Sequence, residues 1–343
     1  MKLINAGEIS FDFQLQNILF IIAHQFEDNK MKIKNNHPLV YFFLLGVIST
    51  VGAIYVLSIL YFSEKGAAEN FPQDYKIISP RMPGNLEFAG EKVPLEDYEV
   101  YERMEREFIV HTYFHSYTIF AIKRANRWFP VIEPILKKNS IPDDFKYLMV
   151  AESNMENVIS PAGATGFWQF LKETGIKYEL EINDLVDERY HVEKSTEAAC
   201  KYLKESYDQF GSWTMAAASY NMGTNGTQNQ VERQKTDNYY NLMLNIETSR
   251  YLGRIISLKY IMQNPDLYGF DIKKNELYNP LKFKEIILDS SVSDIAEYAE
   301  SLGMNYKILK MYNPWLRDNY LNNSTKITYK IKIPEEGSIE IIN

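Results

Sequence analysis

The stretch AESNMENVISPAGATGFWQF, residues 151–170, places a glutamate at the end of an apolar run and follows it with a turn rich in Gly, Ser and Pro. Pro142 and the two aspartates after it are typical of a helix start. In a helix that begins there, four residues stand at i, i+3, i+4 and i+7 and share one face: Phe145, Leu148, Met149 and Glu152. The spacing predicts a mostly apolar, buried stripe that ends in a carboxyl group.

A carboxyl group in apolar surroundings is costly to ionise, so its pKa rises. A glutamate with a raised pKa keeps a proton near neutral pH, which is the requirement for a general acid in glycoside cleavage. The alternative is a helix-end glutamate that turns back to solvent. The next residues favour the first interpretation, because Gly163 and Gly166 allow a tight turn and Gln169 offers an amide. Phe167 and Trp168 are expected either to stack on sugar rings or to belong to the core.

The composition limits the classes of function. The chain has 343 residues, enough for one large or two smaller domains beyond a targeting segment. A net charge of −8 argues against nucleic acid as a partner, since phosphate binding favours a basic face. The single cysteine, Cys200, permits neither an intramolecular disulfide nor a metal site of paired cysteines, and it is expected in the core. His111 and His115 are four apart, but a surface or core pair is favoured over a metal site, and no metal or cofactor is expected.

Residues 39–62 form a run of 24 residues without a charge, which is long enough to cross a bilayer as a helix. We expect an uncleaved transmembrane anchor, because the apolar part of a cleavable signal peptide is shorter. Lys30, Lys32 and Lys34 precede the run, so the positive-inside rule places residues 1–38 in the cytoplasm as a tail. Met1 and Met31 both stay open as start codons. Residues 63–95, rich in Pro, Gly and charge, are expected to be a linker.

Apolar residues recur at helical spacing across residues 96–265, which predicts a mostly α domain with its first helix ended by Pro130 and Pro134. The pattern changes near residue 281. FKEIIL and TYKIKIP are typical of short strands, and between them two helices are expected in SVSDIAEYAESLG, opened by a Ser cap, and in NYKILKMYNPWL. Residues 281–334 are therefore predicted to be a small α+β domain of βααβ order.

Several motifs occur in a specific order across residues 96–265: ES at 152–153, SPAGATGFWQF at 160–170, DERYHVEKSTEAACKYL at 187–203, GSWTMAAASYNMG at 211–223 and ETSRYL at 247–252. Together they resemble the lytic transglycosylase family, which has a lysozyme-like fold of the goose type, and they are most similar to its membrane-bound murein transglycosylase D type. Residues 281–334 resemble a degenerate LysM module. Because SSVSD replaces the usual GDTL-like stretch, glycan binding and a diverged packing domain both stay open for this module.

The resemblance implies cleavage of the β-1,4 bond between N-acetylmuramic acid and N-acetylglucosamine in peptidoglycan. Glu152 would act first as an acid and then as a base on the C6 hydroxyl, which closes a 1,6-anhydro ring. An intramolecular hydroxyl makes a second catalytic carboxylate unnecessary, and Glu156 is interpreted as solvated. The family motifs also place substrate-binding residues around Glu152: Ser153, Ser160, Gln169, Tyr220, Asn221 and Tyr251. Asp187 and Arg189 are expected to form a structural ion pair.

Two alternative functions stay open at this point. One is a lysozyme-type hydrolase of the same bond, and the other is a non-catalytic scaffold that binds peptidoglycan. In every case we expect peptidoglycan strands as the partner, with residues 39–62 in the bacterial cytoplasmic membrane and the catalytic domain on its periplasmic side. Other cell-wall enzymes as partners are left open by the sequence.

Overall fold

The computed structural model describes residues 46–47, 49–55 and 77–337. The chain divides into two units, Met1–Ile77 and Ile78–Asn343. In the first unit residues 46–47 and 49–55 are helical, whereas most of the expected anchor, the tail before it and the linker up to residue 76 lie outside the described residues. Within the described ranges, no helix combines the length and the apolar character that a membrane crossing needs.

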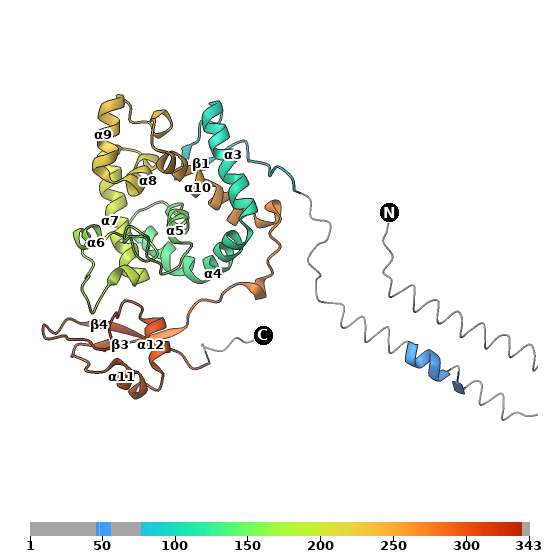
Figure 1. Ribbon diagram of the computed structural model, residues 1–343, viewed down its shortest axis with the longest axis vertical. Helices are drawn as coiled ribbons and strands as arrows, with labels where there is room; N and C mark the ends of the chain where they lie inside the picture. Colours follow the sequence, from blue (N-terminus) through green and yellow to red (C-terminus); the bar gives the residue numbers. More distant parts are fainter. Residues whose placement is uncertain (1–45, 48, 56–76, 338–343) are drawn as a thin grey trace, which may run out of the picture. The chain divides into compact units, whose positions relative to one another are not determined.

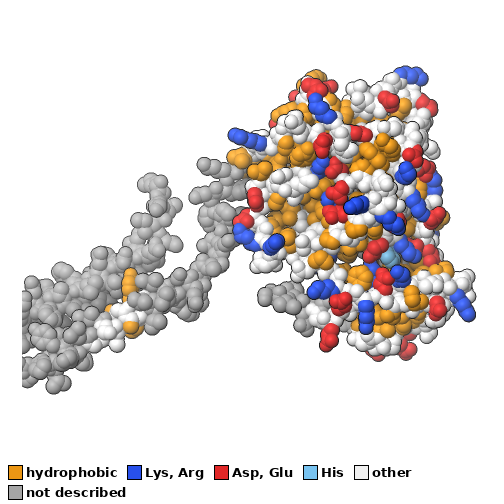
Figure 2. Space-filling model, turned by 180° about the vertical axis from the view of Figure 1, so that it is seen from behind, with side chains coloured by type: hydrophobic (Ala, Val, Ile, Leu, Met, Phe, Trp, Pro, Cys, Tyr) orange, Lys and Arg blue, Asp and Glu red, His pale blue; other side chains and the backbone are white. Residues whose placement is uncertain are grey.

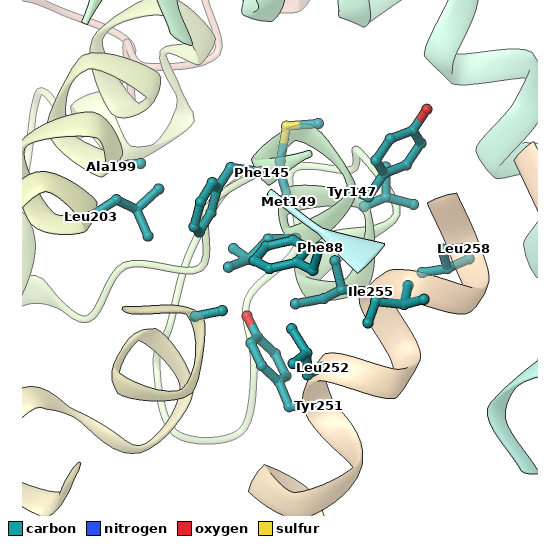
Figure 3. Packing of buried hydrophobic residues seen from close by; sticks show 14 of the residues in the cluster. Phe88, Phe145, Tyr147, Met149, Ala199, Leu203, Tyr251, Leu252, Ile255 and Leu258 are labelled. Atoms are coloured by element: carbon teal, nitrogen blue, oxygen red, sulfur yellow. The ribbon is translucent and has the colours of Figure 1, made fainter. Parts of the chain in front are cut away.

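Helix α5, Phe145–Ser153, is the centre of the second unit. Figure 1 shows it surrounded by longer helices, of which α10, Ile246–Gln263, and α4, His115–Lys138, contact it directly. Every residue from 145 to 150 is buried, so α5 is a core helix on all its faces. Figure 3 shows Phe88, Met149 and Ile255 packed together in this core. The predicted apolar stripe is therefore one side of a helix that has no solvated side along most of its length.

The remaining elements of the helical region enclose this centre. They are β1 Glu87–Phe88, β2 Glu91–Lys92, α3 Tyr98–Tyr113, α6 Lys172–Lys177, η1 Glu188–Tyr190, α7 Val192–Phe210, α8 Trp213–Met222, α9 Thr224–Gln234, η2 Tyr239–Asn241, η3 Pro265–Tyr268 and η4 Lys274–Glu276. The short strands β1 and β2 pair as an antiparallel hairpin. The expectation of a mostly helical domain is confirmed by this order of elements.

One expected helix end is wrong. Pro130 and Pro134 lie inside α4 and do not end a helix, and the chain breaks earlier, at Phe114 between α3 and α4. A proline removes the hydrogen bond to the carbonyl four residues before it. Both prolines are exposed, so water can supply the missing donors on that side and the helix continues.

The C-terminal residues form strands β3, Phe283–Leu288, and β4, Tyr329–Pro334, with α11, Ile295–Ser301, and α12, Tyr306–Tyr312, between them. The strands are antiparallel, with Phe283 opposite Pro334 and Leu288 opposite Tyr329. This confirms the expected βααβ order. The expected Ser cap of the first helix is wrong, because Asp294 accepts hydrogen bonds from the backbone amides of Ala296 and Glu297.

The surface carries charges of both signs. On the face shown in Figure 2, basic and acidic side chains alternate with apolar ones over the folded unit. Opposite charges that are close neighbours offset part of the repulsion that the net charge of −8 produces.

A carboxylate at the start of α5 joins three elements. Asp144 Oδ2 accepts a hydrogen bond of 2.6 Å from the amide of Ala89 in the hairpin and one of 2.8 Å from Lys259 Nζ in α10. Either Asp143 or Asp144 was expected to open the helix. Asp144 stands at the N-cap position, but its side chain does not cap the helix. It instead fixes where α5 lies against the hairpin and α10.

Replacement of this carboxylate should destabilise the whole second unit. In Asp144→Ala the buried ammonium of Lys259 loses its closest carboxylate, which we expect to lower the free energy of unfolding by about 3 kcal/mol. Denaturant unfolding measures this change. The matched control is Asp237→Ala, an exposed aspartate for which we expect a change within about 0.5 kcal/mol. Equal effects of the two variants would contradict the role given to Asp144.

Candidate active site

Glu152 lies in the last turn of α5 and is partly buried. Its Oε1 atom accepts a hydrogen bond from the hydroxyl of Tyr251, which comes from α10 and is 1% exposed. Figure 3 shows the Tyr251 side chain projecting away from α10. Two residues that are 99 positions apart in the sequence thus meet at one carboxyl group.

Burial raises the pKa of Glu152 to about 7, against the partly offsetting effects of the Tyr251 hydrogen bond and the positive charge of Arg254. The negative charge of Glu247 adds to the increase. At neutral pH the carboxyl therefore exists in both protonation states. Burial also raises the pKa of Tyr251 far above its ordinary value, so this residue stays a neutral hydrogen-bond donor.

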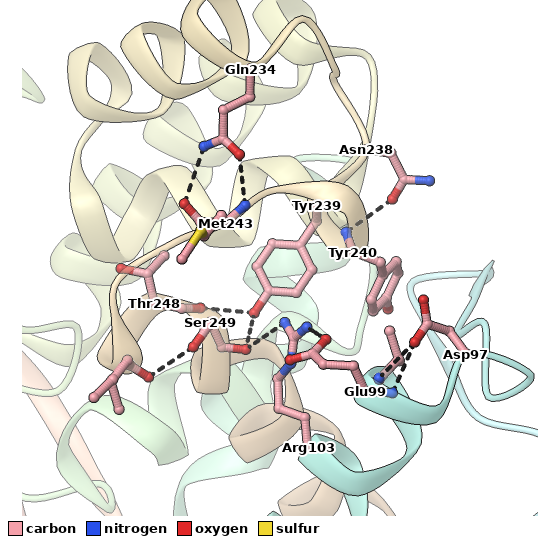
Figure 4. Close-up of polar contacts among 12 residues, drawn as sticks. Asp97, Glu99, Arg103, Gln234, Asn238, Tyr239, Tyr240, Met243, Thr248 and Ser249 are labelled. Carbon is pink, nitrogen blue, oxygen red and sulfur yellow. Dashed lines mark hydrogen bonds and ion pairs between the residues drawn. The ribbon is translucent and has the colours of Figure 1, made fainter.

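The position of Tyr251 is set by hydrogen bonds at the start of α10. The hydroxyl of Tyr239 lies 2.8 Å from the carbonyl oxygens of both Thr248 and Ser249, and Arg103 donates to the carbonyl of Ser249 (Figure 4). The same figure shows the side-chain amide of Gln234 bonded to the backbone amide and carbonyl of Met243. The bonds to Thr248 and Ser249 hold the first turn of α10, and Tyr251 lies in the next turn. The Gln234 bonds hold the segment that precedes the helix.

The turn after α5 folds back on the helix end. Ser153 Oγ donates to the carbonyl of Phe167 at 2.8 Å, which ties the last residue of α5 to the far side of the turn. Ser160 Oγ accepts a hydrogen bond of 3.0 Å from the amide of Ala164 and so closes the turn internally. Both serines, for which the family resemblance predicts substrate binding, have bonds that shape the loop.

The loop is also bound to residues 187–189. Arg189 forms an ion pair of 2.7 Å with Asp187, and its Nη1 atom donates at 3.1 Å to the carbonyls of both Gly163 and Phe170. Gly166 has a φ of +80° and lies so close that an added Cβ would be 2.0 Å from the carbonyl oxygen of Arg189. Glycine is required here for the close approach as well as for the backbone conformation.

Gln169, Tyr220 and Asn221 surround this loop with polar groups. Gln169 Nε2 donates to the carbonyls of Gly166, at 2.8 Å, and Val158, at 3.1 Å. The hydroxyl of Tyr220 donates at 2.7 Å to the carbonyl of Trp168. Asn221 Oδ1 accepts a hydrogen bond of 2.8 Å from Thr248 at the start of α10. The two α8 residues thus connect the loop and α10, whereas the hydrogen bond to Glu152 comes from Tyr251.

Two aromatic residues of the loop belong to the core. Phe167 is 2% exposed and Trp168 is fully buried, with its indole N–H donating to Thr196. Of the two expectations for these rings, sugar stacking is wrong and core packing is confirmed. Glu156 forms an ion pair with Arg124 and keeps 44% of its side chain exposed, so it is paired as well as solvated.

Two further residues near the site, Tyr117 and Arg254, were not predicted from the sequence. Tyr117 donates its hydroxyl to the carbonyl of Val150 in α5 at 2.8 Å. Arg254 follows Tyr251 by one helical turn, and this spacing could have identified it as a neighbour of the carboxyl. His111 is buried and bonded to Ser257, and burial lowers its pKa to about 4. Within the described residues no cluster of His, Cys, Asp or Glu could hold a metal ion.

Comparison with known proteins agrees with the motifs. Residues 129–243 match the family model of the transglycosylase SLT domain, and residues 284–337 match that of the soluble lytic transglycosylase C-terminal LysM-like domain. The chain is 26% identical over 246 residues to the membrane-bound lytic murein transglycosylase D of Escherichia coli K12 and to that of Escherichia coli O6:H1. The alignment covers 69% of this chain and 53% of each relative, so the chain spans about half the length of these relatives. The resemblance inferred from the motifs is thereby confirmed.

Two glycine variants separate the close approach at Gly166 from the cost of its backbone conformation. Gly166→Ala should lower the free energy of unfolding by more than about 2 kcal/mol, because it combines a positive φ with a clash against Arg189. Gly163 has a φ of +82°, and a Cβ added there would meet no other atom. Gly163→Ala should therefore lower the free energy of unfolding by only about 1 kcal/mol. Denaturant unfolding measures both, and equal losses would show that the contact with Arg189 is not tight.

The raised pKa of Glu152 also affects stability. The folded state binds this proton more tightly than the unfolded state, so the stability it contributes is fully present below pH 4.5 and is lost as the pH rises through about 7. Glu152→Gln cannot ionise. The difference between its Tm and that of the wild type should grow in favour of the variant as the pH rises from 4.5 past about 7. Glu156→Gln is the control and is measured over the same pH range. A difference that does not change with pH would contradict the raised pKa.

Proposed function

We propose that this chain is a peptidoglycan lytic transglycosylase that cleaves the β-1,4 bond between N-acetylmuramic acid and N-acetylglucosamine. The observation that carries the proposal is a single partly buried carboxyl group, Glu152, with a pKa of about 7 and a neutral tyrosine donor bonded to it. The match to the transglycosylase SLT domain and the names of the two relatives support the same reaction.

In the first step, protonated Glu152 gives its proton to the glycosidic oxygen, and the bond from that oxygen to C1 of the muramic residue breaks. In the second step, the carboxylate takes the proton of the C6 hydroxyl while the C6 oxygen bonds to C1. The glutamate is protonated again, and no water is consumed. A pKa near neutral suits a group that must serve in turn as acid and base. Tyr251 would hold the carboxyl in place through both steps.

The other site residues receive supporting roles in this proposal. Tyr220 and Asn221 would hold the sugar next to Glu152. The side-chain amide of Gln169 would replace one of its hydrogen bonds to a loop carbonyl with a hydrogen bond to the substrate. Ser153 would fix the end of α5, and Ser160 would lie near the muramic residue. Ser153, Ser160 and Gln169 lie on the end of α5 or on the loop after it. Tyr220 and Asn221 lie in α8 and bond to Trp168 of the loop and to Thr248 of α10.

The proposal includes the arrangement of the whole chain. Residues 96–265 would be a catalytic domain of the goose-type lysozyme-like fold, and residues 281–334 would be a LysM-like module. Residues 39–62 would anchor the chain in the cytoplasmic membrane, with the catalytic domain on the periplasmic side. The uncharged run of 24 residues and the membrane-bound relatives support this placement.

The reaction product tests the proposal. Sacculi digested by the wild-type protein should release muropeptides with 1,6-anhydro ends, as measured by mass spectrometry. Glu152→Gln should be slower by about a thousandfold, because it cannot donate a proton, whereas Glu156→Gln should be nearly unchanged. Reducing ends would identify a hydrolase. A wild-type protein that binds sacculi without releasing any fragment would identify a scaffold.

The pH dependence of the reaction tests the part played by Tyr251. Because the reaction begins with protonated Glu152, kcat/KM should fall as the pH rises past about 7. The Tyr251 hydrogen bond lowers the pKa of Glu152, so Tyr251→Phe should reduce the rate and move this alkaline limb to higher pH. An alkaline limb that moves to lower pH in Tyr251→Phe would be incompatible with this contact.

A further inference from the structure

Residues 281–334, called here the C-terminal unit, share their apolar core with residues 181–191 of the helical region. Val186 is 1% exposed and Tyr190 is 5% exposed, and both are buried in one apolar cluster with residues of the C-terminal unit. Leu288, Ile295, Leu309, Trp315 and Ile331 are members of that cluster. The core of the small unit is therefore completed by side chains that precede it by about a hundred residues.

The backbone joins the two regions at the same place. The amide of Asp187 donates to the carbonyl of Trp315 at 2.9 Å, and the amide of Arg317 donates to the carbonyl of Leu185 at 2.8 Å. Val186 and Leu316 form an antiparallel bridge between these bonds. Backbone pairing of this kind fixes the register of two segments, in contrast to a surface contact between side chains.

Side chains strengthen the junction on both sides of this bridge. The guanidinium of Arg317 lies over the ring of Tyr190, 4.0 Å from its centroid. The hydroxyl of Tyr329 donates to the carboxylate of Glu181 at 3.1 Å. Lys332 of β4 forms an ion pair with Glu193 in the first turn of α7. The C-terminal unit therefore contacts the helical region through backbone hydrogen bonds, a cation–π contact and an ion pair.

The segment held in this way is also the one that binds the loop beside Glu152. Asp187 lies directly after the bridge and pairs with Arg189, whose side chain holds the carbonyls of Gly163 and Phe170. The carbonyl of Arg189 is packed against Gly166. A displacement of residues 185–187 would therefore move both contacts that Arg189 makes with residues 163–170.

We propose that the C-terminal unit is a positioning element of the active site, which holds residues 185–189 and through Arg189 the loop of residues 163–170. The proposal rests on the proposed function, since it concerns the loop that carries Gln169 and supports Ser153 at the end of α5. The C-terminal unit affects turnover through this contact whether or not it binds glycan. Val186 and Arg317 are positioning residues for the reaction at Glu152.

The experiment compares variants of the full chain. Val186→Ala removes two methyl groups from the junction, and Val292→Ala makes the same change in the same apolar cluster outside residues 181–191. Hydrogen exchange is followed at residues 163–170 and, as an internal reference, in α3. Turnover is measured on a soluble tetrasaccharide of alternating N-acetylglucosamine and N-acetylmuramic acid, with kcat and KM determined separately.

We expect Val186→Ala to raise exchange at residues 163–170 by about tenfold, with α3 unchanged, and Val292→Ala to leave these residues as in the wild type. The kcat of Val186→Ala should fall by about threefold or more while KM stays within about twofold, because substrate binding outside the loop persists. Arg189→Lys should lower kcat similarly. The two changes combined should be no worse than the slower single change, since both act through the same contact.

Two results would overturn the inference: unchanged exchange at residues 163–170 in Val186→Ala, or effects of Val186→Ala and Arg189→Lys on kcat that multiply. If Val186→Ala does not fold, Tyr329→Phe removes only the hydroxyl contact with Glu181 and takes its place under the same expectations. If the wild-type protein cleaves no glycan, the proposed function fails, and the exchange measurements still decide whether the C-terminal unit holds the loop.

Discussion

The hydrogen bond from Tyr251 to Glu152 joins the last turn of the central helix α5 to α10, and the site depends on this contact. Burial alone would push the carboxyl toward its protonated form, and the hydroxyl partly opposes this by stabilising the charged form. The balance leaves a pKa of about 7. A carboxyl group that was fully exposed would be ionised at neutral pH, and one that was buried without a donor could not easily give up its proton.

The surrounding structure maintains this balance from three directions. Tyr239 and Arg103 hold the start of α10, and Asn221 of α8 accepts a hydrogen bond from the same turn. Ser153 ties the end of α5 to the loop that follows it, and Arg189 holds that loop from outside. Most of these contacts involve backbone carbonyls, so they fix the path of the chain as well as the side chains. The site is thus formed by segments that are tied to one another by hydrogen bonds within the chain.

The features predicted from the sequence are those that depend on local spacing or on motif order. The burial of α5, the βααβ order and the family resemblance follow from periodicity and short motifs. The errors arise where tertiary contacts override a local signal. Pro130 stays inside α4 because its side of the helix faces water, and Asp144 reaches the hairpin and Lys259 when it could have capped α5. The contact of Val186 with Leu316 has no local signal at all, since 130 residues separate the two segments.

The central claim is that the surroundings of Glu152 keep it protonated well above the usual range of a glutamate. Its direct test is a carbon-13 NMR titration of the side-chain carboxyl in protein labelled at glutamate, with Glu152→Gln used to assign the resonance. The account predicts a midpoint near pH 7 for this resonance. A midpoint near 4.5, the ordinary value for glutamate, would contradict the account.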